Sequence, residues 1–109
     1  MAKSINFNNI TKRYLNVTFT DEKNTTVMVC MPTKGILREL TNIQAEVDTE
    51  DDFAALDELY NVCAKVLSRN KAGKVITPEF LEDVFDFDDI MIFLKEYMNF
   101  VAEAAGRKN

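Results

Sequence analysis

The chain of 109 residues contains no histidine and no tryptophan, and it has only two cysteines, three glycines and two prolines. The absence of histidine removes the side chain most often used for acid–base catalysis near neutral pH. The glycines, Gly35, Gly73 and Gly106, form no phosphate-binding loop. The serines, Ser4 and Ser68, do not occur in a nucleophile-elbow sequence. The sequence therefore predicts a protein that is not an enzyme, with no catalytic residue and no cofactor.

The cysteines and the clustered aspartates are residue types that often bind metals, but their spacing in this chain favours other roles. Cys30 and Cys63 are too few and too far apart for a disulfide framework or a zinc site. Their strand and helix contexts predict buried, reduced thiols. Asp86, Asp88 and Asp89 are close together, but no glycine and no distal glutamate follow at the spacing of a calcium loop. Lying within one helical turn, they also do not flank a substrate cleft as the paired carboxylates of a glycosidase do. We expect them to cap a helix, and we expect no metal site.

Long apolar runs are missing as well. A membrane-spanning helix needs roughly 20 apolar residues, and the runs in this chain are only a few residues long. Residues 1–6 lack the apolar core of a signal peptide, so we expect a protein of the cytosol. Its length fits one domain over residues 1–109.

Charge is distributed unevenly along the chain, whose net charge is −5. Most acidic side chains lie from Glu46 onward, in the predicted first turns of helices, where the helix dipole favours them. Lysine and arginine are scattered and form no clustered basic face. The sequence therefore predicts neither a nucleic-acid partner nor a membrane partner.

The first third of the chain alternates apolar and polar residues, which is the pattern of β-strands. In the first segment, Ile5 and Phe7 share a face. The residues 21–24 suit a hairpin built on a type I turn. The expected strands are 4–8, 14–20 and 25–31.

The remainder of the chain shows helical periodicity, with a capping residue before each apolar stripe. The expected helices are 33–47, 50–69, 77–85 and 87–105. Their expected N-caps are Thr33, Thr49, Thr77 and Asp86, and Gly106 is expected to end the last helix. In the second helix we expect Phe53, Leu59 and Cys63 to face inward. The fold class is therefore α+β, with a small N-terminal antiparallel hairpin or sheet, about residues 4–31, packed on a bundle of about four helices.

The last predicted helix carries more apolar surface than one contact face requires. At about 100° per residue, its apolar residues cover roughly half of the circumference. Ile92 then falls on the polar side, between Lys95, Glu96, Asn99 and Glu103. An ordinary surface helix has one apolar stripe and a polar back, and methionine is common at adaptable binding surfaces. The aromatic residues of the same helix also suit a core position beneath the hairpin, so both interpretations stay open here. The residues that we expect to bind a partner are Phe87, Met91, Ile92 and Met98.

Three parts of the chain together resemble a known family. They are the hairpin pattern with Val-Thr-Phe-Thr at 17–20 and Val-Met-Val at 27–29, the acidic helices, and the C-terminal region. That region reads Ile76-Thr-Pro-Glu-Phe-Leu-Glu-Asp-Val-Phe, followed by Asp88-Asp-Ile-Met-Ile-Phe-Leu-Lys-Glu-Tyr-Met. In this order of elements the chain is similar to the small tail assembly chaperones of long-tailed bacteriophages and of prophages in Gram-positive bacteria. The resemblance spans most of the chain as a pattern of elements and contains no invariant motif.

The resemblance implies a non-enzymatic helper in the cytosol of the host cell, absent from the mature virion. Such a helper binds the tape measure protein and recruits tail tube subunits, and many members also exist as a longer, frameshifted form. Two other interpretations stay open. One is a structural virion protein of the tail or head-completion type that pairs through its hairpin edge. The other is an acidic regulatory or inhibitor module that mimics nucleic acid. Whether the chain forms a homo-oligomer is also left open.

Overall fold

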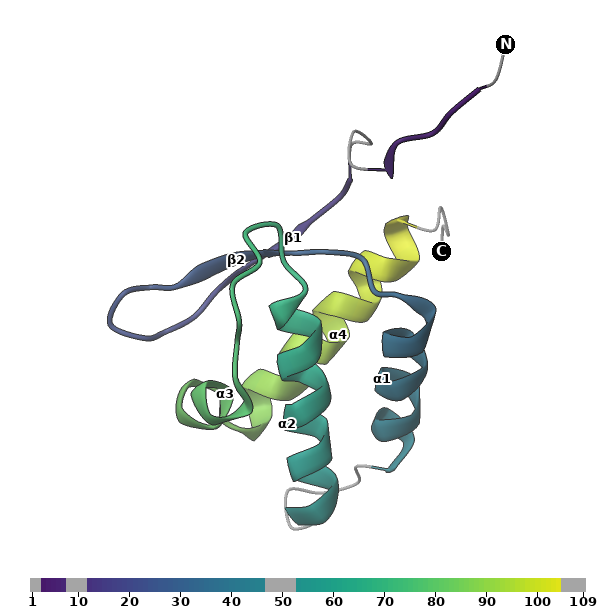
Figure 1. Cartoon of the computed structure of the whole chain (residues 1–109). Coiled ribbons are helices and arrows are strands. Elements are labelled where there is room, and N and C mark those ends of the chain that lie inside the picture. Colours follow the sequence, from purple (N-terminus) through teal and green to yellow (C-terminus); the bar gives the residue numbers. More distant parts are fainter. Residues whose placement is uncertain (1–2, 8–11, 47–52, 105–109) are drawn as a thin grey trace.

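The computed structural model describes residues 3–7, 12–46 and 53–104 of the chain. Two strands and four helices follow one another along these residues (Figure 1). They are β1 (Leu15–Thr18), β2 (Thr26–Val29), α1 (Lys34–Glu46), α2 (Phe53–Ser68), α3 (Pro78–Val84) and α4 (Phe87–Ala104). The strands form an antiparallel sheet that precedes the helices, which confirms the predicted α+β fold.

The turn of the hairpin is built by local polar chemistry at the predicted position. The backbone N–H of Asn24 donates to the carbonyl oxygen of Asp21 at 3.0 Å. Asn24 has a φ of 50°, a left-handed conformation that asparagine tolerates better than most residues. The carboxylate of Asp21 accepts hydrogen bonds from the hydroxyl and the backbone N–H of Thr25, and these bonds lower the pKa of Asp21. The turn thereby fixes a register in which Thr18 lies opposite Thr26.

The other edge of β2 is paired with the turn after α2, which the sequence did not indicate. Val29 forms an isolated antiparallel bridge with Asn70. The backbone N–H of Cys30 donates to the carbonyl oxygen of Arg69 at 2.8 Å. β2 therefore lies between β1 and residues 69–71, and the hairpin is attached to α2 through the main chain.

The side chain of Asn70 holds this turn together from inside, and it is buried. Its amide nitrogen donates to the carbonyl oxygens of Leu67 and Lys74 at 2.8 and 2.7 Å. Its amide oxygen accepts from the backbone N–H of Lys74 at 2.9 Å. Gly73 takes the φ of 70° that reverses the chain. One side chain thus satisfies three main-chain groups, of which the carbonyl of Leu67 is buried and the two groups of Lys74 are partly buried.

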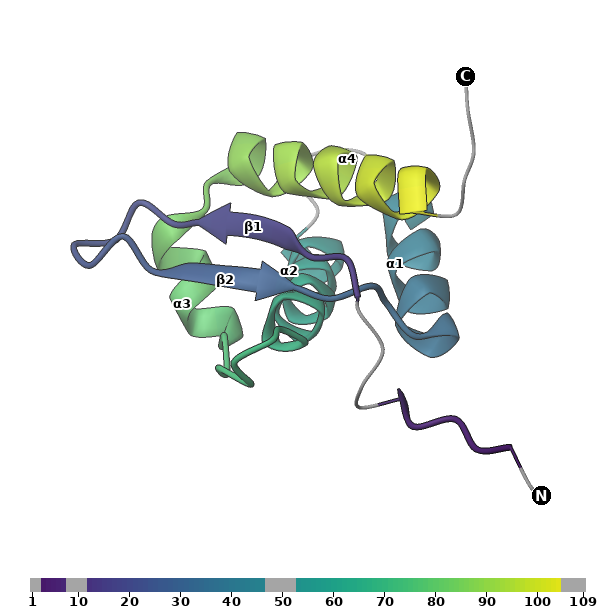
Figure 2. The same cartoon turned by 90° about the horizontal axis from the view of Figure 1, so that it is seen from above.

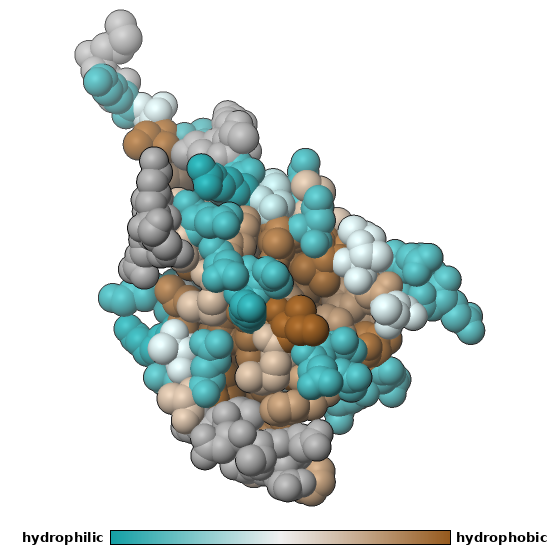
Figure 3. All heavy atoms as spheres, turned by 180° about the vertical axis from the view of Figure 1, so that it is seen from behind, coloured by the Kyte–Doolittle hydropathy of each residue, from teal (hydrophilic) through white to brown (hydrophobic). Residues whose placement is uncertain are grey.

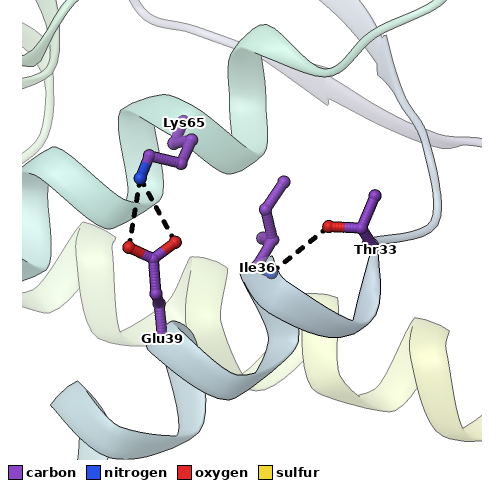
Figure 4. A network of polar contacts seen from close by, with 4 residues as sticks. All are labelled: Thr33, Ile36, Glu39 and Lys65. Atoms are coloured by element: carbon purple, nitrogen blue, oxygen red, sulfur yellow. Dashed lines mark hydrogen bonds and ion pairs between the residues drawn. The ribbon is translucent and has the colours of Figure 1, made fainter.

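The helix starts follow the predicted caps where the structure describes them. The hydroxyl of Thr33 accepts from the backbone N–H of Ile36 at 3.2 Å at the start of α1 (Figure 4). The hydroxyl of Thr77 accepts from Phe80 at 3.1 Å, with Pro78 in the first helical position. The predicted cap Thr49, the apolar residue Val47 and the terminating Gly106 lie outside the described residues.

One hydrophobic core joins the inner face of the hairpin to all four helices. Seen from above, the two strands lie over the helices, with β1 on the side of α4 (Figure 2). Two tyrosines tie the parts together: Tyr97 donates to the carbonyl oxygen of Cys30 at 3.0 Å, and Tyr60 to that of Phe85 at 2.8 Å. Burial raises the pKa of both hydroxyls, so they stay protonated donors further into the alkaline range than an exposed tyrosine does.

Two expectations about the fold were wrong in detail. Residues 4–7 of the predicted first strand lie in no strand, and Ile5 and Phe7 are 73% and 67% exposed. Alternation supplies a strand-like face, but a strand also needs a neighbouring strand to pair with, and residues 4–7 are not part of the sheet. Phe53 was expected to face inward and is 75% exposed. It is the first residue of α2, and its side chain is directed toward the helix N-terminus, beyond the packed part of the helix.

We predict that Asn70→Ala lowers the free energy of unfolding by about 2 kcal/mol, because one buried and two partly buried main-chain groups lose their partner. Urea denaturation monitored by circular dichroism measures this change. Asn61→Ala, at an exposed position of α2, is the matched control and should change stability by less than about 0.5 kcal/mol. Equal effects of the two substitutions would contradict the role assigned to Asn70.

Candidate protein-binding surface

The start of α4 is fixed by two aspartates that cap each other's main chain. The backbone N–H of Asp89 donates to the carboxylate of Asp86 at 2.8 Å, and that of Asp86 donates to the carboxylate of Asp89 at 3.1 Å. This reciprocal arrangement is a capping box. Asp88 and Asp89 also lie in the first turn, where the helix dipole stabilises negative charge. The predicted capping role of the acidic cluster is therefore confirmed for this pair.

The inner face of α4 is anchored by a continuous row of aromatic rings. Phe19 of the hairpin packs edge-on against Phe80 of α3 at 5.1 Å between ring centroids, and it contacts Phe85 at 5.4 Å. The row continues along α4 from Phe85 to Phe93, then to Tyr97 and Phe100. Aromatic pairs at these distances add to the free energy of burial. The row therefore fixes which face of α4 is turned toward the core.

The four residues expected to bind a partner differ in exposure. Ile92 is 60% exposed and Met91 is 39% exposed. Phe87 and Met98 are half-buried and pack against the core. Seen from the side on which α4 lies, hydrophobic side chains gather in the middle of the molecule between hydrophilic ones (Figure 3).

These four residues lie on two different parts of α4. Phe87, Met91 and Met98 are spaced by four and seven residues, so they form one stripe beside the core face. Ile92 points about 100° away from Met91 around the helix axis and lies nearly opposite the buried Ile90 and Tyr97. The apolar surface of α4 thus has a half-buried margin and a separate, exposed centre at Ile92.

Ile92 also borders a groove between α4 and β1. The groove has a volume of about 200 Å³ and passes between the end of the hairpin and the first half of the helix. Its lining combines apolar side chains with two threonines and one aspartate. The lining residues are Thr18, Thr20, Val84, Phe85, Asp89, Ile92 and Phe93. The sequence predicted Ile92 as a partner-binding residue. It did not predict the groove, because the groove depends on where β1 lies, and no local pattern encodes that position.

A second groove lies between α1 and α2 and is mostly polar. It has a volume of about 330 Å³ and includes Glu39, Asn61 and Lys65 among its lining residues. Lys65 and Glu39 form an ion pair across it at 3.1 Å (Figure 4). Both side chains are about half exposed, so the pair contributes at most about 1 kcal/mol.

Potential metal ligands are dispersed over the part of the chain that the structure describes. Within residues 3–7, 12–46 and 53–104, no three histidine, cysteine or acidic residues come together in a way that could hold a metal ion. Cys63 is fully buried, and burial raises the pKa of its thiol from 9 to about 12. Such a thiol is a poor nucleophile, because the thiolate is the reactive form. Cys30 is only half-buried, not buried as we expected.

Comparisons of the chain with protein-family models, with curated proteins and with solved structures each returned no match. The resemblance to tail assembly chaperones therefore stays a prediction. Among the described residues, no helix has the length and apolar character that crossing a membrane requires.

We predict that the buried thiol of Cys63 makes the fold sensitive to alkaline pH. The unfolded thiol ionises above pH 9, whereas the folded thiol stays neutral up to about pH 12. Stability is thus fully present below pH 9 and declines as the pH rises toward 12. The Cys63 contribution is a loss of about 1.4 kcal/mol between pH 8 and 10.

Urea unfolding measures the free energy of unfolding at pH 8 and at pH 10. Between these pH values, the decline in Cys63→Ala should be smaller than in the unmodified chain by about 1.4 kcal/mol. Cys30→Ala, which keeps the Cys63 thiol, should retain the full decline. An unchanged pH dependence in Cys63→Ala would show that this thiol is not the source of the effect.

Proposed function

We propose that this protein is a non-enzymatic tail assembly chaperone of a bacteriophage or prophage, acting in the cytosol of the host cell. Its partners in this proposal are the tape measure protein and the tail tube subunits. The observation that carries the proposal is the 60% exposure of Ile92 in the middle of α4, opposite a face that the core already occupies. A large apolar side chain in that position, with Met91 and the groove beside it, suits an apolar client helix.

The chemistry of a tape measure protein explains why such a surface is useful. A long, partly apolar helical protein aggregates unless its apolar stripes are covered before the tube encloses it. A small chaperone covers one stripe through one exposed helix face. Many copies along one client gain avidity, although each contact is weak. Arriving tube subunits then displace the chaperone without any chemical step.

Charge supports the same role. The chain has a net charge of −5, and acidic side chains occupy the first turns of α3 and α4. Negative charge around a small apolar contact keeps a chaperone–client complex dispersed. Because the contact itself is apolar, the affinity in this proposal depends little on salt.

A second candidate function is favoured by one feature of the hairpin. The outer edge of β1 pairs with no strand among the described residues. An open edge suits a structural virion protein of the tail or head-completion type, which would join its neighbours by strand pairing. The two candidates differ in whether the protein stays in the finished particle.

We predict that Ile92→Asp weakens binding to the co-expressed tape measure protein by at least tenfold, roughly 1.4 kcal/mol, without lowering the thermal midpoint of unfolding. A charge in the centre of an apolar contact loses its hydration on binding. Pull-down from co-expressing cells and titration calorimetry measure the effect.

The matched control is Asn99→Asp, which adds the same charge seven residues later on the same exposed face of α4. It should bind within about twofold of the unmodified chain. If Ile92→Asp and the unmodified chain bind equally well, the contact does not involve the centre of α4.

We also predict that mass spectrometry of purified phage particles detects no copies of this protein, whereas lysates from the assembly period contain it bound to the tape measure protein. A chaperone leaves when the tube closes around its client. Stoichiometric copies in the particle would favour the structural candidate.

A further inference from the structure

The outer edge of β1 presents main-chain groups that are ready for another strand. The backbone N–H of Phe19 donates to the carbonyl oxygen of Thr25 at 2.8 Å. In an antiparallel pair, alternate residues bond to the partner strand, so Val17 also bonds inward and the main chain at Asn16 and Thr18 faces outward. No strand in the described part of the chain lies along this edge.

The groove beside this edge supplies a place for apolar side chains. An added strand next to β1 would have one face directed into the space between β1 and α4. Ile92 and Phe93 line that space from the helix, Thr18 lines it from the end of β1, and Thr20 lines it from the hairpin beyond β1. Main-chain pairing along an edge with a neighbouring side-chain pocket is the arrangement by which extended peptides add to a sheet.

The same chain contains a segment with the sequence pattern of such a strand, and its last residue, Phe7, would have to change from a 3₁₀ conformation to an extended one. Ile5 and Phe7 alternate with polar residues, and their side chains are 73% and 67% exposed. Figures 1 and 2 show residues 3–7 extending away from the body of the molecule, and in Figure 2 they lie on the side away from α4. Two large apolar side chains two residues apart would enter the same side of an added strand.

We infer that residues 4–7 of a second copy of this chain add as a strand to the outer edge of β1, with Ile5 and Phe7 inserted between β1 and α4 beside Ile92. Each copy gives one strand and receives one, so the contact is symmetric and closes as a dimer. The inference goes beyond the proposed function and does not depend on it.

Charge and geometry favour a second copy as the occupant. Lys3 precedes the strand, and Asp89 lines the groove with Asp88 next to it in the first turn of α4, so the charges of donor and acceptor are opposite. Residues 3–7 of the same copy extend away from α4 (Figure 2), and reaching the groove would require them to turn back past the start of β1.

The test uses two full-length variants, each of which damages one half of the contact. Ile5→Asp/Phe7→Asp removes the apolar side chains of the donor segment and leaves the acceptor edge intact. Thr18→Pro removes an outward N–H from the acceptor edge and leaves the donor segment intact; proline is tolerated at edge positions whose N–H is not in the ladder. Sedimentation equilibrium measures the dissociation constant of each.

A matched control separates edge blocking from damage to the hairpin. The hydroxyls of Thr18 and Thr26 contact each other at 2.9 Å, so Thr26→Pro loses the same contact as Thr18→Pro. Thr26 lies opposite Thr18 in the register, and its N–H therefore points to the other edge of the sheet. Thr26→Pro should dimerise as the unmodified chain does.

The expected results are a dimer for the unmodified chain and a dissociation constant at least about tenfold higher for each of the two variants. An equimolar mixture of the two variants should form a heterodimer, because one contributes a working strand and the other a working edge.

Three results would overturn the inference. They are an unmodified chain that is monomeric at all concentrations, a mixture of the two variants that does not associate, and a dimer that survives Ile5→Asp/Phe7→Asp. A monomeric unmodified chain whose Thr18 amide is protected from hydrogen exchange would identify its own segment as the occupant.

A peptide experiment keeps the inference testable if Thr18→Pro does not fold. A synthetic peptide of residues 3–8 is added to the isotope-labelled Ile5→Asp/Phe7→Asp chain, which retains its own acceptor edge. Amide shifts in the nuclear magnetic resonance spectrum should be largest at Asn16, Thr18 and Ile92. Absence of saturable shifts at these residues would overturn the proposed site, and shifts confined to other residues would place the segment elsewhere.

Discussion

The structure depends on the contact between the inner face of the hairpin and the aromatic side chains of α3 and α4. A two-stranded hairpin is marginally stable in water by itself, and its β1 and β2 strands have four residues each. Phe19 is 1% exposed and contacts both Phe80 and Phe85. This ring therefore joins the hairpin to α3 and to the C-cap of α3, which leads into α4. The same packing turns Ile90 and Tyr97 inward and leaves Ile92 outward.

The features that the sequence predicted correctly are those determined by neighbouring residues. The caps at Thr33, Thr77 and Asp86 and the turn closed by Asp21 need only residues within four positions. The exposure of Ile92 followed from helical periodicity, which is also local.

The features that the sequence did not reveal need partners far along the chain. The bridge between Asn70 and Val29 joins segments 41 positions apart, so no local pattern reveals it. Residues 4–7 have the alternation of a strand, and alternation does not state where the partner strand is. The groove beside Ile92 exists because the hairpin packs with β1 on the side of α4 (Figure 2). For the same reason, the four expected binding residues divide into a half-buried stripe and a separate exposed centre.

The open edge of β1 and the exposed centre of α4 meet at one residue. Ile92 lines the groove that would receive a strand, and it is also the middle of the surface that would receive a client helix. One side chain of this size cannot be covered by both occupants at once. The two contacts that we propose therefore compete, and a client at α4 would disfavour the dimer by mass action. Free copies would then keep their apolar groove covered by one another and expose it when a client displaces the strand. Dimerisation of the free copies thereby protects the open edge of β1 and the exposed side chain of Ile92 from nonspecific association before the client is made.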